Sequence, residues 1–128
     1  MNKIKGILID VENEKAECIE VESTLGEYYR ILNCETIDIV RRKIGRKELN
    51  IICDDEGLLK DEPKISAIDN LGGVMLVGNL FIVSGIVDDN CDLVSLTNEE
   101  TEYIMQRVQK MYTRNFPNGY PMLTQCEY

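Results

Sequence analysis

The chain has 128 residues, of which 44% are hydrophobic, and its formal net charge at pH 7 is −9. This length and composition predict one folded domain with its own core, and they exclude a disordered chain. The negative charge disfavours direct binding to nucleic acid, because neutralising phosphates requires a basic face. The sequence has no histidine, which excludes every mechanism and metal site that needs an imidazole.

Membrane and metal signals are also missing from the sequence. No apolar run reaches the length of a membrane span, and the first residues lack the apolar stretch of a signal peptide. We therefore expect a cytoplasmic protein that does not engage a membrane. The five cysteines never show C-x-x-C spacing, which argues against a disulfide framework and a zinc site. We expect buried, reduced thiols at Cys18 and Cys53, and neither a metal nor a cofactor.

The first third of the chain predicts a hairpin and a helix. Residues 3–11 and 15–24 have strand-like sequences, and the polar segment 12–15 forms the turn between them. Thr24 and Glu27 then have the T-x-x-E spacing of a capping box at a helix start. The helix should end near Asn33. Its predicted apolar face consists of Leu25, Tyr28, Tyr29 and Leu32. We expect the two tyrosines to lie in the core and not at a ligand.

A second hairpin is predicted over residues 35–55. Its strands, "ETIDIVRRK" and "KELNIICDD", flank a turn at Gly45. In the second strand, alternation places Leu49, Ile51 and Cys53 on one face. This hairpin puts a basic cluster at its turn and an acidic cluster at the far end of the returning strand.

The remainder predicts a connection, a central strand and a helix. Residues 57–73 form a long connection with one short strand at "KISAI", and residues 73–86 form the central strand, with a bulge or close approach at Gly78. Thr97 and Glu100 form a second capping box. The following helix has an apolar stripe of Ile104, Val108, Met111 and Tyr112.

The order of elements is therefore β-β-α-β-β-(β)-β-α, which is a small α+β domain with an antiparallel-rich sheet. The domain is expected over residues 1–113. Residues 114–128 cannot continue a helix past Pro117, so we predict an irregular tail. Its apolar residues are compatible with docking on the domain and with a homo-oligomer.

The first candidate site is the acidic cluster of Asp54, Asp55 and Glu56. A calcium loop starting at Asp54 would place Leu58 at its fifth position, where an oxygen ligand is required. No carboxylate spacing demonstrates a catalytic pair either. The acids are thus interpreted as a partner-binding surface, against the simpler alternative of a solvated strand end.

The second candidate site is basic and surrounds the predicted turn. Arg41, Arg42 and Arg46 are suited to bidentate contacts with phosphates or carboxylates, so they are candidates for binding a partner or a small anionic ligand. The alternative is a charged hairpin that blocks pairing between strand edges. The sequence has neither a phosphate-binding loop nor a nucleophile elbow, and we assign no catalytic residue.

Several short motifs in order carry a resemblance to a known family. They are "LGEYYRILNCETIDIV", "IICDDEGLLKDEPKISAID", "MLVGNLFIVSG" and "LVSLTNEETEYIM". The chain resembles a bacterial and phage family of small proteins known only as a domain of unknown function. Its members look like accessory proteins of conjugative elements and phages, especially in Firmicutes. The chain departs from the family at Pro63-Lys64, where members often have Pro-Asn, and the resemblance covers roughly residues 3–110.

The resemblance implies a biological context more than an activity. We expect a non-enzymatic counter-defence inhibitor that binds a host defence protein or sequesters a nucleotide-type immune signal in the host cytoplasm. One alternative is an acidic DNA mimic, although the basic cluster would spoil the mimicry. The other is a small carboxylate-dependent enzyme that uses Asp54, Asp55 or Glu56.

Overall fold

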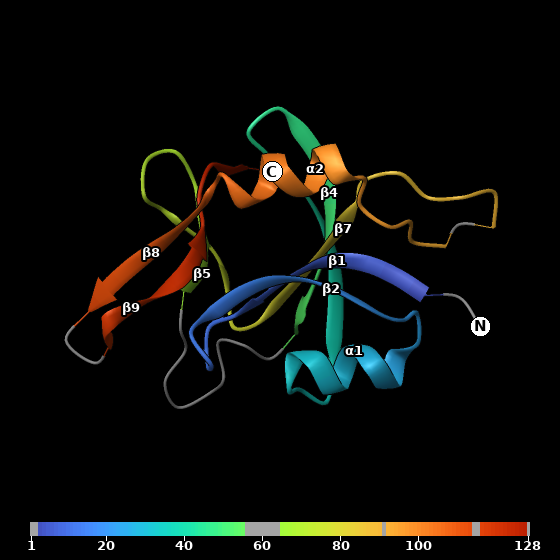
Figure 1. Ribbon diagram of the computed structural model, residues 1–128, viewed down its shortest axis with the longest axis horizontal. Helices are drawn as coiled ribbons and strands as arrows, with labels where there is room; N and C mark the ends of the chain where they lie inside the picture. The colour runs from blue at the N-terminus through green and yellow to red at the C-terminus, as the bar shows by residue number, and fades with distance from the viewer. Residues whose placement is uncertain (1–2, 56–64, 91, 114–115, 128) are drawn as a thin grey trace.

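The computed structural model describes residues 3–55, 65–90, 92–113 and 116–127. Within these ranges the chain forms two short helices and ten strands, arranged in two mostly antiparallel sheets (Figure 1). The predicted α+β class is therefore confirmed.

The larger sheet has the strand order β10-β3-β4-β7-β1-β2. Both predicted hairpins belong to it, and each pairs without interruption along its two strands. β7 joins the hairpins, because its Ile82 pairs with Ile7 on one side and Ile51 on the other. The strands are β1 (Lys3–Asp10), β2 (Lys15–Glu22), β3 (Ile37–Ile44), β4 (Lys47–Asp54), β7 (Leu80–Ser84) and β10 (Cys126–Glu127).

The smaller sheet has the order β6-β5-β9-β8. Its pairings are antiparallel except between β5 and β9, which meet in parallel at Ala67 and Leu123. The strands are β5 (Ile65–Ile68), β6 (Val74–Val77), β8 (Val108–Thr113) and β9 (Phe116–Leu123).

The segment predicted as one central strand, residues 73–86, forms two strands in different sheets. The chain turns at Gly78, whose φ of +80° is readily adopted only by glycine. Asn79, which is buried, fixes the crossing: its Oδ1 accepts a hydrogen bond from the Val11 N–H, and its Nδ2 donates to the Leu32 carbonyl. β7 is central as expected, whereas β6 is an edge strand of the smaller sheet.

Helix α1 (Leu25–Leu32) begins at Thr24 and ends at Asn33, as predicted. The capping box is only half formed. Thr24 Oγ1 accepts from the Glu27 N–H, but the Glu27 carboxylate accepts two hydrogen bonds from Arg30, which hold the pKa of Glu27 below its usual value. The predicted apolar face is also shifted. Leu25 is 59% exposed, and Ile31 is buried in its place beside Tyr28 and Leu32.

Helix α2 (Asn98–Met105) has the complete capping box predicted for Thr97 and Glu100. It is shorter than predicted. Val108 and the residues after it form β8, because pairing with β9 satisfies their backbone groups and overrides the helical spacing of the apolar side chains. Of the predicted stripe, Ile104 is buried on the helix, and Tyr112 is 66% exposed on β8.

The segment expected to be an irregular tail forms β9 and β10 in the described residues 116–127. β9 contributes Met122 and Leu123 to the core, and Cys126 of β10 is also fully buried. The prediction of an irregular tail is wrong because it rests on Pro117, which ends a helix but is compatible with this strand. Pro117 and Pro121 both lie in a strand that pairs with β8 on one side and touches β5 at a single residue pair on the other.

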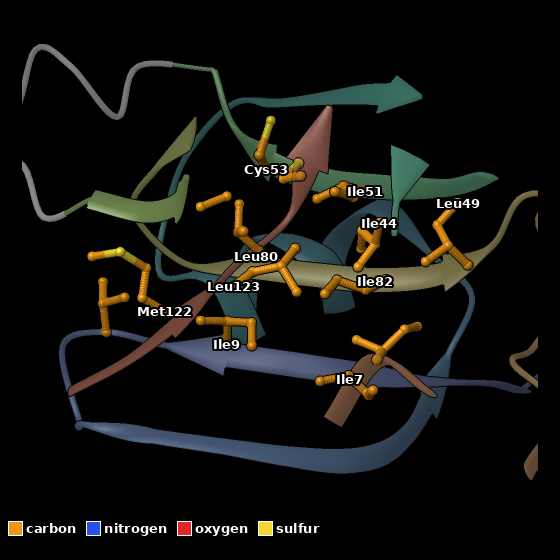
Figure 2. Close-up of a cluster of buried hydrophobic side chains, with 14 of the residues drawn as sticks. Ile7, Ile9, Ile44, Leu49, Ile51, Cys53, Leu80, Ile82, Met122 and Leu123 are labelled. Carbon is orange, nitrogen blue, oxygen red and sulfur yellow. The ribbon is translucent and has the colours of Figure 1, made fainter. Parts of the chain in front are cut away.

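The core has two parts, one on each face of the larger sheet. One lies between the two sheets, and Figure 2 shows side chains from β1, β4, β7 and β9 converging there. The other lies under α1 and includes Leu8, Ile52 and Phe81 from the opposite face of the same strands. Residues 51–53 of β4 and residues 80–83 of β7 are therefore apolar without alternation, as expected for strands covered on both faces. Cys53 is buried as predicted, but Cys18 on β2 is exposed, which corrects the expectation for that thiol.

Candidate functional site

The turn of the β3–β4 hairpin is the centre of the basic candidate site. Ile44 pairs with Lys47, so Gly45 and Arg46 form a two-residue turn. Gly45 has a φ of +62° at the first turn position, as a type II′ turn requires, and this turn matches the twist of the flanking strands. The sequence thus displays Arg46 at the end of the hairpin, where its side chain is exposed.

Tyr103 of α2 holds this turn in place. Its hydroxyl accepts a hydrogen bond of 2.8 Å from the Arg46 N–H. The Arg107 guanidinium stacks 3.6 Å from the centre of the Tyr103 ring and donates through Nε to Gln125 Oε1. The Gly45 N–H donates to the Gln125 carbonyl. Figure 1 shows α2 lying beside the β3–β4 turn.

Arg107 and Tyr103 were not among the predicted site residues. Arg107 adds a cation next to Arg46 and Lys47, and the Lys47 Nζ lies 5.5 Å from the centre of the Tyr103 ring. The spacing of Tyr103 and Arg107, four residues apart at the end of a helix, was the only signal in the sequence. Nothing in the sequence predicted that this helix end would contact the hairpin turn.

Arg41 and Arg42 lie along β3 and have different surroundings. Arg41 is exposed and forms an ion pair of 2.9 Å with Glu48, the residue diagonally opposite on β4. Exposed ion pairs of this kind contribute at most about 1 kcal/mol, so Arg41 can exchange this partner for another. Arg42 is half-buried, and its NH1 donates to the Arg41 carbonyl.

The acidic candidate site lies at the other end of the same hairpin. Asp54 pairs with Ile37 and is only 7% exposed, whereas Asp55 is exposed in the turn that follows. The predicted site residue Glu56 lies outside the described residues. At about 3.3 Å per residue, β4 separates Lys47 from Asp54 by roughly 23 Å. The structure therefore does not bring Asp54 and Asp55 together with the basic candidates, and of these two described acids only Asp55 presents an accessible carboxylate.

Two cavities lie elsewhere. The larger, of about 560 Å³, is beside α1 and the β1–β2 turn; the smaller, of about 460 Å³, is beside the 88–94 loop. Neither is lined by Arg41, Arg42 or Arg46. Tyr28 does not offer a stacking platform, because it is buried against Phe81 with its hydroxyl bonded to Ser23.

The larger cavity has a polar, mainly acidic lining over an apolar floor. Asp10 is buried there, and its carboxylate accepts hydrogen bonds from the backbone N–H and the side chain of Asn13. Lys15 at the rim is paired with Glu17. In the described parts of the chain, no group of three His, Cys, Asp or Glu side chains is placed to hold a metal ion.

The two buried thiols, Cys53 and Cys126, are unreactive at neutral pH. Burial raises the pKa of Cys53 to about 11, and burial likewise raises the pKa of Cys126 to about 11. Since the thiolate is the reactive form of cysteine, neither residue is suited to nucleophilic chemistry at neutral pH.

The chain was compared with models of protein families, with curated proteins and with solved structures. The model of a family described as a domain of unknown function, DUF3846, matches residues 4–113. No curated protein and no solved structure matches the chain. No helix in the described ranges is both long enough and apolar enough to span a bilayer.

Proposed function

The chain belongs to the DUF3846 family of unknown function, and from that premise we propose that it is a non-enzymatic counter-defence inhibitor of phages or mobile elements. It acts by binding a host defence protein in the bacterial cytoplasm. The observation that carries the proposal is the basic end of the β3–β4 hairpin, defined as Arg41, Lys43, Arg46, Lys47 and Arg107, of which Arg41, Lys43 and Arg46 are exposed and the other two half-buried.

The geometry of this basic end favours a protein partner over a small ligand. The cations of this end are spread along strand and turn, and they line neither described cavity. A sequestered nucleotide would need an enclosed site that buries most of its surface. A protein partner needs only a complementary acidic face, and arginine is enriched where such faces meet.

Local rigidity also supports a binding role. Tyr103, Arg107 and Gln125 fix the turn through the hydrogen bonds and the stacking contact described above. Fixing the turn before the partner arrives lowers the entropy that is lost on binding. A DNA mimic is less well supported, because this cationic surface would repel the basic groove that a mimic must enter.

An infection assay tests the proposal. The protein is expressed in a panel of bacterial hosts, each with one defence system, and phage plating efficiency is measured. We expect wild-type protein to restore plating on at least one defended host. Arg46→Glu should lose this effect, whereas Glu17→Lys, a charge reversal on the distant strand β2, should keep it. Unchanged plating on every defended host would contradict the counter-defence role.

A further inference from the structure

The basic strand β3 is an edge strand for most of its length. Among the described residues, its only neighbour on the side away from β4 is β10, which pairs with Ile44 and Lys43 and reaches no further. The stretch Ile37–Arg42 therefore lines an edge of the larger sheet. Open edges of this kind are templates for pairing with another strand.

The hairpin geometry identifies which backbone groups face outward. Ile44 and Lys47 close a two-residue turn, so they exchange hydrogen bonds, and the residues of β3 then alternate between facing β4 and facing away. The Gly45 N–H bonds to Gln125, on the β10 side, which agrees with this alternation. Ile39 and Arg41 thus direct their N–H and C=O groups to the open edge.

Two of these outward groups are occupied by neighbouring side chains. Asp38 Oδ1 accepts a hydrogen bond of 2.9 Å from the Ile39 N–H, and Arg42 NH1 donates one of 2.9 Å to the Arg41 carbonyl. Both contacts are exposed and join adjacent residues. Water can replace these two exposed hydrogen bonds, so another partner can take their place at small cost.

The charge of this edge differs from that of the opposite edge. On β3, the exposed residue Arg41 lies in the open stretch and the exposed residue Lys43 directly follows it. Ile39, also in the stretch, is 47% exposed. The other edge of the same sheet is β2, where Glu17, Glu20 and Glu22 outnumber Lys15. An acidic segment is therefore attracted to one edge and repelled by the other.

From these observations we infer that the β3 edge over Ile37–Arg42 binds an extended acidic segment of a partner protein as an added strand. The incoming strand continues the line of β10, replaces the two side-chain hydrogen bonds at the edge, and places its carboxylates near the exposed cations Arg41 and Lys43. Ile39 supplies the apolar contact. This inference rests on the proposed function and specifies how the partner is held.

The test uses the full chain and synthetic peptides in place of the partner. The probe is a short peptide of alternating glutamate and valine, compared with its lysine counterpart and with a version N-methylated on every residue. Hydrogen exchange of backbone amides is followed by nuclear magnetic resonance. We expect the acidic peptide at millimolar concentration to slow exchange of the Arg41 amide several-fold, with no slowing on β2. The lysine peptide should have no effect.

Variants and the methylated peptide make the inference falsifiable. Arg41→Glu should abolish the slowing, whereas Glu20→Lys on β2 should leave it unchanged. The N-methylated acidic peptide keeps the charge but cannot form the ladder, so it should not protect Arg41. Equal binding of the methylated peptide, protection on β2, or no protection by the acidic peptide would each overturn the inference. Protection without any effect on phage plating would instead contradict the proposed function alone.

Discussion

Gly45 shows how one residue position serves both the fold and the candidate site. Its φ of +62° permits the tight turn, and a β-carbon there would meet the Tyr103 hydroxyl and lie 2.8 Å from Arg107 Nε. The same contacts hold the turn against α2. The turn itself could be predicted from the dipeptide Gly45-Arg46, whereas its contacts with Tyr103 and Arg107 depend on tertiary packing.

Substitutions of three glycines separate the cost of a left-handed backbone conformation from the cost of steric contact with neighbouring side chains. Gly45→Ala should lower the free energy of unfolding by about 1–2 kcal/mol or more, since it combines a left-handed φ with steric contact. Gly72→Ala, with a φ of +83° and open space around it, should show the backbone cost alone. Gly26→Ala, in helix α1 with nothing nearby, should gain about 0.5–1 kcal/mol. Urea unfolding measures all three, and equal effects at Gly45 and Gly72 would contradict the proposed contact.

The buried thiols predict a dependence of stability on pH. The folded-state pKa values of Cys53 and Cys126 are raised to about 11 from the ordinary value of 9.0. Above pH 9 the unfolded chain therefore loses thiol protons that the folded chain keeps, so stability falls as the pH rises from about 9 to 11. Thermal unfolding across this range should show the loss. A Cys53→Ala variant that loses stability just as steeply would contradict this assignment.

At the scale of elements, local signals predicted most starts and turns. Both hairpins, the Thr24 and Thr97 caps and the Asn33 helix end follow from short-range chemistry. The predictions were wrong where pairing with a strand distant in the sequence determines the secondary structure. β6 and β7 separate at Gly78 because each has its own neighbours, and Val108 joins a strand because β9 is there to pair with it. The distant partner, and not the local spacing, determines these elements.

The two helix caps make a matched comparison. At α2 the hydrogen bonds between Thr97 and Glu100 are reciprocal, whereas at α1 the Glu27 carboxylate is bound to Arg30. Thr97→Ala should cost about 1 kcal/mol. A double-mutant cycle of Thr97 with Glu100 should show a larger coupling energy than a cycle of Thr24 with Glu27. Chemical unfolding measures both cycles. Equal coupling energies would show that the hydrogen bond from the Thr97 N–H to the Glu100 carboxylate adds no stability.

At the scale of the whole molecule, the C-terminal segment completes the core although the family match ends at residue 113. Leu123 of β9 is fully buried between the sheets, next to Ile9 and Leu80 in Figure 2. The candidate site also needs this segment, because Gln125 contacts both Gly45 and Arg107. The sequence did not predict this, since Pro117 obscured a strand whose place is defined by its pairing with β8.

Truncating Leu123 tests this structural role. Leu123→Ala should lower the free energy of unfolding by about 2–5 kcal/mol, the usual cost of emptying a buried leucine site. Leu71, which is 96% exposed, supplies the control, and Leu71→Ala should change stability by less than about 0.5 kcal/mol. If Leu123→Ala is as mild as the control, β9 does not hold the two sheets together.

The central claim is that the basic end of the β3–β4 hairpin binds a host protein. Quantitative mass spectrometry of proteins co-purified from host cells tests it most directly, with wild type, Arg46→Glu and the matched control Glu17→Lys prepared in parallel. We predict a protein that is enriched with wild type and with Glu17→Lys and is lost with Arg46→Glu. Enrichment that is the same for all three proteins, or no enriched protein in any of them, would contradict the claim.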